Sequence, residues 1–425
     1  MQSSVGNAIG YVALLLLAYD RFRSPWAVSL VLLADFLPAI VLAPLFGALA
    51  DRCSRRLLVV SADLLRCAAF VAIAFAGSFA VILVLALVAG AGTALYHPAS
   101  KSALAALAGP DAGPAMGALV TIWSAASVAG PALGAALLLV LEPSALLLVD
   151  ASTFLISAVV LSRLSLDRPR AAVAAPDVAG LATAQSDNVN IAIAAGELVT
   201  AQDGDAPIGH GVRAGLRAAR AVDGLGAVVG AGVAATLSFS LMNVAEPLLA
   251  TDELDAGGGV FALLVCLFGV GSTVGALRGR AELQVLLASL AGGGLLLCAS
   301  ALAQSVVFAA VTFLGTGLFA GAVMSSDHQL VARLAPEEIR GRVFGLKDSL
   351  DAIAFCSAFV AGGLIASLGD SRTVFAASGA GALLVALLAA VALRHMRVGV
   401  TASGYQRRAR QTGRRAPSAR RPTGY

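Results

Sequence analysis

Uninterrupted apolar runs of about twenty residues recur along the chain and restrict its fold more than any other feature. A helix needs about twenty apolar residues to cross a bilayer core, whereas a membrane β-strand needs about ten with alternating polarity. The sequence therefore predicts an all-α membrane protein with about twelve transmembrane helices. The runs lie near residues 3–20, 26–50, 57–77, 79–106, 115–140 and 145–162, and then near 224–250, 258–277, 282–302, 305–333, 343–368 and 373–394.

The composition agrees with a helix bundle surrounded by lipid. Hydrophobic residues make up 59% of the chain, charged residues make up 13%, and the mean hydropathy is +0.88. A soluble protein would need more polar groups to cover its surface. The chain also has 45 glycines, and small residues allow helices in a bilayer to approach one another closely. These values favour a tightly packed membrane bundle.

A polar stretch divides the apolar runs into two sets of six. Each set predicts one six-helix bundle, and the polar stretch predicts a cytoplasmic central loop with a short amphipathic helix whose arginines recur at helical spacing. The arginine-rich end of the chain predicts a disordered cytoplasmic tail held near anionic lipid. The predicted parts are the N-terminal bundle 1–163, the central loop 164–222, the C-terminal bundle 223–394 and the tail 395–425.

The two sets of runs also repeat. An offset of 228 residues relates Gly47 to Gly275, at the ends of the second and eighth runs. The same offset relates Gly117 to Gly345 in the region of the fifth and eleventh runs. One shared offset at corresponding positions indicates two parallel repeats, so we expect the bundles to be pseudo-symmetric. In membrane proteins built this way, a binding site lies between the halves, near the midplane.

The basic residues predict which way the chain crosses the membrane. With the N-terminus inside, the outer loops hold only Arg21, Arg23 and Arg372, and Lys101 lies within the fourth run. The other 25 of the 29 Lys and Arg residues then lie on or near the cytoplasmic side, as the positive-inside rule requires. The first run has no basic leader and no small-residue cleavage site, so we expect a span rather than a cleaved signal peptide.

No pattern in the sequence predicts an enzyme, a metal site or a bound cofactor. The five cysteines and four histidines are scattered, without CxxC or HExxH spacing. No phosphate-binding GxxxxGK[ST] motif occurs. Glycine clusters at 224–230 and 269–275 miss the dinucleotide-binding spacing and lie within apolar runs, which favours helix packing. Any uphill movement of cargo would have to be driven by an ion gradient.

The loop after the second run carries the most specific motif. It reads GALADRCSRR from Gly47 to Arg56 and resembles the signature loop of the major facilitator superfamily, GxLxDRxGRR, with Ser54 where the family usually has glycine. The alternative is an ordinary basic cytoplasmic loop, which explains the arginines but not the Gly-x-Leu-x-Asp spacing. The resemblance implies a cytoplasmic latch between the halves, formed by Gly47, Leu49, Asp51, Arg52, Arg55 and Arg56.

The fifth run resembles the antiporter motif of the same family, in which glycines surround a GPxxG core. Its proline would permit a bend and its glycines would form a groove for a neighbouring helix. The alternative is generic packing of small residues. The resemblance favours export, and the matching positions are Gly117, Gly130, Pro131 and Gly134.

Further motifs resemble the exporter branch that includes siderophore and macrolide efflux proteins. They are Pro98-Ala99, the segment from Asp150 to Phe154, and the segment from Ile339 to Gly345. The resemblance implies an antiporter of the plasma membrane that exports an amphiphilic drug, siderophore or secondary metabolite by alternating access, coupled to protons. We expect the chain to act as a monomer. The alternatives are an uptake transporter of the same fold and a non-transporting receptor or secretion-associated protein.

Three carboxyls inside the runs are candidates for proton coupling, because a charge in the membrane is costly unless it is paired or hydrated. Asp35 lies about nine residues into the second run, roughly 13 Å deep and near the midplane. Asp150 and Glu246 lie toward the outer ends of their runs, where a partnered or interfacial acid is the alternative. Such a carboxyl could bind and release a proton during transport.

Other charged residues have the spacing of local ion pairs on one helix face. They are Asp63 with Arg66 and Lys347 with Asp351, and we expect both pairs to be structural. Asp327 and His328 lie in the inner third of the tenth run, where we expect water to reach them.

Candidate cavity residues are polar or amphipathic and lie on the first, fourth, fifth and seventh runs, the helices that line the cavity in this superfamily. Trp123 and the two tyrosines could equally be packing residues, which is the commoner case. A largely apolar cavity suits amphiphilic molecules. The predicted partners are a small-molecule substrate, a proton or other coupling ion and anionic lipids, without nucleic acid. The candidates are Asn7, Tyr11, Tyr96, Trp123 and Asn243.

Overall fold

The computed structural model describes residues 2–42, 45–46, 49, 53–108, 126, 129–164, 216–217, 219 and 222–393. All regular secondary structure within these residues is helical, which confirms the predicted fold class. The N-terminal half contains α1 Gln2–Phe22, α2 Pro25–Val41, α4 Arg55–Phe75, α5 Phe79–Ala108 and α7 Pro143–Arg163. Residues 129–137, from the fifth predicted run, are helical as well.

The C-terminal half begins with a span built from three pieces. Its parts are α9 Leu225–Ser240, α10 Met242–Leu248 and the π-helical turn η4 Leu249–Glu253. Pro247 lies inside α10 and cannot donate a backbone hydrogen bond, which is a usual cause of irregularity in a helix. The other helices are α11 Gly257–Ala276, α12 Leu283–Ser300, α13 Val306–Leu334, α14 Glu337–Leu368 and α15 Ser371–Leu393.

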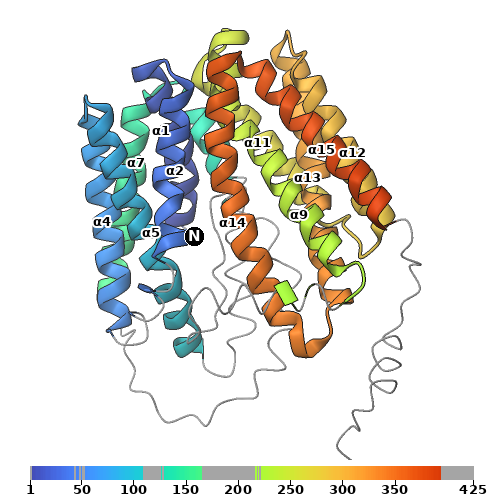
Figure 1. Cartoon of the computed structure of the whole chain (residues 1–425). Coiled ribbons are helices and arrows are strands. Elements are labelled where there is room, and N and C mark those ends of the chain that lie inside the picture. Colours follow the sequence, from blue (N-terminus) through green and yellow to red (C-terminus); the bar gives the residue numbers. More distant parts are fainter. Residues whose placement is uncertain are drawn as a thin grey trace, which may run out of the picture.

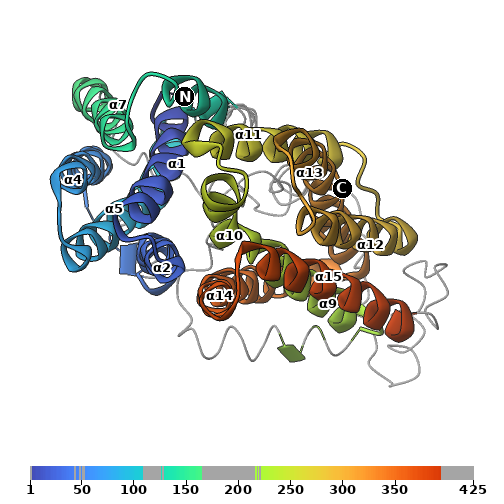
Figure 2. The ribbon, with the colours of Figure 1, turned by 90° about the horizontal axis from the view of Figure 1, so that it is seen from above.

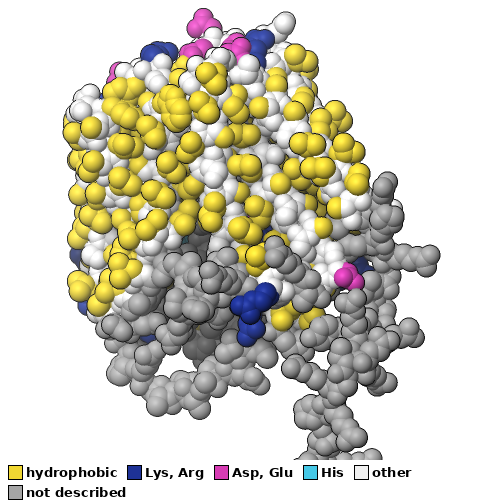
Figure 3. All heavy atoms as spheres, in the orientation of Figure 1, with side chains coloured by type: hydrophobic (Ala, Val, Ile, Leu, Met, Phe, Trp, Pro, Cys, Tyr) yellow, Lys and Arg dark blue, Asp and Glu magenta, His cyan; other side chains and the backbone are white. Residues whose placement is uncertain are grey.

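The lengths of these helices agree with about twelve membrane spans. Nine helical segments in the described part of the chain are long and apolar enough to cross a membrane, counting Leu225–Glu253 as one. The 17-residue α2 is a shorter apolar helix, and the 21-residue α1 and the partly described fifth run complete the set. Hydrophobic side chains cover the flank of the molecule, and charged side chains gather at its top end (Figure 3).

The helices form two six-helix bundles with the same internal arrangement. In the first half, α4 packs against α5 and α7, α2 packs against α5, and α1 packs against α7. In the second half, α12 packs against α13 and α15, α11 packs against α13, and α9 packs against α15. The two sets of helices lie side by side in both views (Figures 1 and 2). The predicted pseudo-symmetry is therefore confirmed.

Glycines bring α11 and α13 into backbone contact. A side chain at Gly271 or Gly275 would collide with the backbone of α13, and one at Gly317 or Gly321 would collide with the backbone of α11. The packing interpretation of the 269–275 cluster is thus correct. It is wrong for Gly224, which precedes α9 in a turn with φ of 80°, a conformation that favours glycine.

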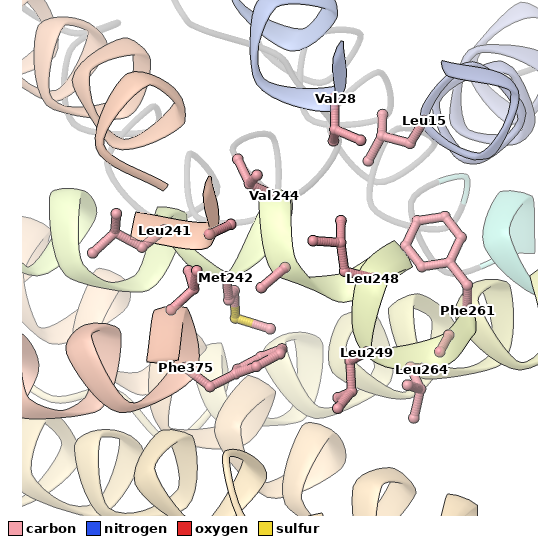
Figure 4. Packing of buried hydrophobic residues seen from close by; sticks show 14 of the residues in the cluster. Leu15, Val28, Leu241, Met242, Val244, Leu248, Leu249, Phe261, Leu264 and Phe375 are labelled. Carbon is pink, nitrogen blue, oxygen red and sulfur yellow. The ribbon is translucent and has the colours of Figure 1, made fainter. Parts of the chain in front are cut away.

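The two ends of the bundle differ in how the halves meet. The turn from α1 to α2 lies at the top of Figure 1, and we call this end of the bundle the Arg23 end after the residue in that turn. The opposite end, where α7 finishes, is the Arg163 end. A large hydrophobic cluster on the Arg23 side contains residues of both halves, including Leu15 and Val28 against Val244 (Figure 4). Toward the Arg163 end, the buried clusters of described residues each belong to a single half.

Candidate functional site

Half of the predicted latch lies outside the described residues, namely Gly47, Asp51 and Arg52. Leu49 is helical and packs against a hydrophobic cluster of the N-terminal half. The hydroxyl of Ser54 accepts a hydrogen bond from the Leu57 amide at 3.2 Å and so caps α4, which gives a reason for serine at this position.

The two remaining latch arginines lie at the start of α4. Arg55 is its first residue, and the Arg56 guanidinium donates a hydrogen bond to the carbonyl of Ser162 near the end of α7. This described contact therefore joins two helices of the same half. The contact across the halves that the latch interpretation requires stays a prediction.

The antiporter-like segment packs on α1 through one of its glycines. A side chain at Gly130 would collide with Ala8, and the backbone carbonyl of Val5 is also close. Pro131 and Gly134 are buried, but no described residue lies within 4 Å of a side chain added at Gly134. Gly117 and the cavity candidate Trp123 lie outside the described residues.

Arg66 is the centre of a buried charged cluster in the N-terminal half. Its guanidinium donates a hydrogen bond to Asp63, which confirms the predicted local pair. The same guanidinium lies over the rings of Tyr96 and Phe154, at 4.4 and 4.3 Å from their centroids. Tyr96, a cavity candidate, therefore belongs to the surroundings of Arg66, and it also packs against a hydrophobic cluster of its own half.

Asp150 on α7 is fully buried against α1. Its Oδ1 accepts a hydrogen bond from the Thr153 hydroxyl at 3.3 Å, and its Oδ2 has no hydrogen-bond partner among the described residues. Side chains added at Gly6 or Gly10 would collide with Asp150 or Thr153. The two glycines of α1 thus create the space in which this carboxyl lies. Among the described residues, one carboxylate oxygen of Asp150 therefore has a hydrogen-bond partner and the other has none.

Four of the sequence candidates lie in one region between the halves. The hydroxyl of Tyr11 on α1 lies 3.5 Å from Oδ1 of Asn243 on α10. Asp35 on α2 and the buried Glu246 on α10 both lie near enough to Tyr11 to act on its hydroxyl electrostatically. The structure thus brings together residues that lie far apart in the sequence. Asn7 lies half-buried near the start of α1, one helical turn before Tyr11.

A second buried charged cluster lies in the C-terminal half. The Lys347 ammonium binds Asp351 one turn along α14, which confirms the predicted pair. The same ammonium lies 2.9 Å from Oδ2 of Asp327 on α13, and Thr236 on α9 donates a hydrogen bond to Asp351 at 3.1 Å. The charged residues are between 2% and 6% exposed. Asp327 is enclosed by α9, α13 and α14 and is not exposed at the surface. The expectation that water reaches it is therefore wrong.

This cluster lines a cavity of about 70 Å³ between α9, α10, α11, α13 and α14. Sequence reasoning noticed Asp327 and Lys347 but missed their contact, since they lie on different helices. The sequence did contain an indication of this contact. One basic and two acidic residues lie in apolar runs, and burying their charges in the membrane is energetically costly unless they pair. Other lining residues are Phe239, Asn243, Phe268, His328 and Phe355.

The halves are also joined by polar contacts at the Arg23 end. The Tyr19 hydroxyl donates a hydrogen bond to Asp252 in η4, and Nη1 of Arg23 lies 3.8 Å from the same carboxylate. The next acid, Glu253, instead accepts from Nε of Arg372 at 2.9 Å within its own half. Within the described residues, no group of three or more His, Cys, Asp and Glu side chains could hold a metal ion.

Comparisons with known proteins agree with this architecture. Solved structures that share the fold include the human organic anion transporter MFSD10, which is 19% identical with a TM-score of 0.53 over 91% of this chain and 98% of MFSD10. The nucleoside transporter NupG is 11% identical with a TM-score of 0.68 over 93% of this chain and 98% of NupG. An auto-inhibited peptide transporter of the POT family is 14% identical with a TM-score of 0.65 over 93% of this chain and 96% of that one.

Sequence comparison gives the family. The chain is 30% identical over 162 residues to an uncharacterized MFS-type transporter, YfiS of Bacillus subtilis (strain 168), and this match spans 37% of the chain and 39% of YfiS. The family model described as Major Facilitator Superfamily matches residues 3–346 and, in a second match, residues 228–421. With both halves matched and the two-bundle fold in place, the chain belongs to the Major Facilitator Superfamily.

Proposed function

We propose that this chain is a secondary active transporter that exports an amphiphilic small molecule by alternating access, in exchange for protons. The observation that carries the proposal is the unequal interface between the halves. Described residues of both halves share one hydrophobic cluster on the Arg23 side, whereas the clusters toward the Arg163 end belong to one half each. Two rigid bundles joined at one end have the arrangement required for access from the other end.

Buried carboxyls support coupling to protons. Among the buried residues of the described chain, five acids (Asp63, Asp150, Glu246, Asp327 and Asp351) accompany two residues with a full positive charge, Arg66 and Lys347. An unpaired charge away from water is expensive, so the excess carboxyls need protons or another cation. Asp35 and Glu246 are the leading candidates, because both lie near Tyr11 between the halves.

The orientation of the chain in the membrane is proposed from the distribution of its charged residues. The Arg23 end carries Arg21, Arg23 and Arg372 among several acids, whereas Arg55, Arg163 and Arg333 lie toward the opposite end. We propose that the Arg163 end is cytoplasmic and contacts anionic lipids of the plasma membrane, with both termini inside. Residues 1–163 and 223–394 would move as two units joined by the loop 164–222, and one chain would suffice for transport.

The cargo is proposed from the lining of the cavity. Apolar side chains such as Phe239, Phe268 and Met324 share it about equally with polar and charged ones, a mixture that suits an amphiphile better than a sugar or a phosphate. The fold neighbours are described as transporters of organic anions, nucleosides and peptides, so the fold itself does not select a cargo. The resemblance to siderophore and macrolide efflux proteins and the partial antiporter motif support export.

Accumulation in intact cells tests the proposal. Efflux-deficient bacteria expressing the chain would receive a panel of amphiphiles, with and without a protonophore. We expect lower accumulation of at least one compound, abolished by the protonophore and by Asp35→Asn. The surface variant Asp370→Asn serves as the control and should leave export intact.

Each other result of this experiment has a defined meaning. Protonophore-sensitive higher accumulation would replace export with uptake. Lower accumulation that survives both the protonophore and Asp35→Asn would exclude proton coupling through Asp35. No change across the panel, with the protein confirmed in the membrane, would favour a non-transporting receptor.

A further inference from the structure

The cavity of the C-terminal half is lined by both charged and aromatic side chains. Asp327 and Asp351 bring two carboxylates to it, and Lys347 brings one ammonium group. With all three groups ionised, the cluster carries one net negative charge. A buried site with this balance attracts a monovalent cation, because an uncompensated charge away from water is costly.

The polar atoms of the cluster are unequally satisfied. The Lys347 ammonium is held by both carboxylates, and Asp351 accepts a further hydrogen bond from Thr236. Oδ1 of Asp327 has no hydrogen-bond partner among the described residues, although the residue is only 2% exposed. Lys347 is therefore already engaged, whereas Oδ1 of Asp327 is an unpaired acceptor enclosed next to Gly232 of α9, so a donor from the cavity reaches it when this contact loosens.

The remaining walls suit an organic cation. Phe239, Phe268 and Phe355 line the cavity together with Met242 and Met324. Aromatic faces attract ammonium groups, and methionine adapts its shape to apolar partners. The volume of about 70 Å³ is far below the roughly 300–1,000 Å³ of a site that encloses a whole drug-sized ligand. The cavity thus fits a head group rather than a complete molecule.

We propose that this cavity binds the protonated amine group of the transported molecule, so that the cargo is a cationic amphiphile. The inference rests on the proposed transport function and deepens it. The amine donates a hydrogen bond to Oδ1 of Asp327, and the apolar body extends along Phe355 and Met242 toward Asn243 at the interface of the halves.

Binding to the purified full-length protein in lipid nanodiscs tests this assignment without transport. Calorimetry would compare 2-phenylethylamine, 2-phenylethanol and 3-phenylpropionate, which share one body and carry a positive, neutral and negative group. We expect the amine to bind most tightly. Asp327→Asn should weaken amine binding by roughly tenfold or more, to the level of the alcohol. Asp63→Asn, which alters a buried pair outside the cavity, should retain the preference for the amine.

A second variant keeps the test decisive if Asp327→Asn does not fold. Lys347→Gln releases both carboxylates, so the amine should bind it more tightly than it binds the parent. Equal affinity for the three compounds, tightest binding of the propionate, or unchanged amine binding in Asp327→Asn would overturn the assignment. Heat from sodium chloride with none from the amine would assign the cavity to an inorganic cation and also overturn it.

The two proposals fail separately. If cells export another amphiphile while the amine does not bind, the amine site is wrong and the transport function stands. If the amine binds as described and cells never move it or any other compound, the site stands and the transport function is wrong.

Discussion

At the scale of single residues, buried charged side chains have the largest expected effect on stability. Arg66 is 2% exposed, binds Asp63 and lies between two aromatic rings. A guanidinium suits this place better than an ammonium, because it is planar and stacks on aromatic faces. Removing it would leave the Asp63 carboxylate buried without its cation.

We therefore predict that Arg66→Met strongly destabilises the protein. Breaking a buried ion pair by removing one partner costs about 3–5 kcal/mol. Arg372→Met is the matched control, since Arg372 pairs with Glu253 at a partly exposed site, where such pairs contribute about 0–1 kcal/mol. Apparent melting temperatures of the purified proteins should fall much further for Arg66→Met. Equal falls would mean that burial adds little to this pair.

The sequence predicts contacts between residues close together on one helix, but not contacts between residues of different helices. Asp63 and Arg66 are three residues apart on one helix, so their spacing alone predicts the pair. The rings of Tyr96 and Phe154 lie on α5 and α7, and no spacing relates them to Arg66. The contact of Asp327 with Lys347 likewise depends on how α13 and α14 pack.

At the scale of elements, glycine determines how closely helices approach. Helices in a bilayer gain no hydrophobic effect from associating, so packing between small residues has to hold them together. Gly271 and Gly275 face the backbone of α13, and Gly317 and Gly321 of α13 face the backbone of α11. Backbone atoms of each helix thus occupy the space of the missing side chains of the other.

Adding one methyl group tests this contact. Gly275→Ala would place Cβ against the Leu318 carbonyl, and we expect it to destabilise the protein by about 1–3 kcal/mol, the usual cost of overpacking. Gly230→Ala is the control, because Gly230 is exposed on α9 with no described atom within 4 Å of the new Cβ. It should be neutral or stabilising, since alanine favours helix. Melting temperatures that change alike would contradict close packing at Gly275.

Hydropathy predicted the elements well and their irregularities poorly. The eleventh run starts near residue 343, but α14 begins at Glu337, because its polar first turn lies outside the apolar signal. The seventh run is predicted to end near residue 250, whereas helical structure continues through η4 to Glu253. An apolar run indicates which residues lie in the bilayer, but not where a helix begins in its polar first turn. The π-turn depends on local hydrogen bonds, which hydropathy does not predict.

At the scale of the whole molecule, that π-turn determines which half its acids contact. Asp252 receives hydrogen-bonding and ionic contacts from Tyr19 and Arg23 of the other half, whereas Glu253 binds Arg372 in its own half. Arg23 itself has a positive φ of 44°, which is uncommon for a residue with a side chain. Asp252 is therefore the polar link that closes the Arg23 end, beside the shared hydrophobic cluster.

Cys356 is a native reporter for the opening of this end. It lies on α14 within the shared cluster and is 8% exposed. In a variant that retains only this cysteine, a membrane-impermeant maleimide added outside intact cells should react slowly. Asp252→Asn weakens the contacts that close this end. A loss of about 1 kcal/mol would raise the open-to-closed ratio about fivefold, and the labelling rate with it.

Glu253→Gln separates the closing contact from a general loss of negative charge at this end. The two acids are neighbours in η4, and each substitution replaces one carboxylate with an amide. Only Asp252 contacts the other half, so only Asp252→Asn should speed the labelling of Cys356. Equal acceleration by both variants would mean that the charge at this end, rather than the Tyr19–Arg23–Asp252 contact, controls opening. No acceleration by either would leave closure to the hydrophobic cluster, whose packing between Leu15, Val28 and Val244 would then hold the halves together by itself.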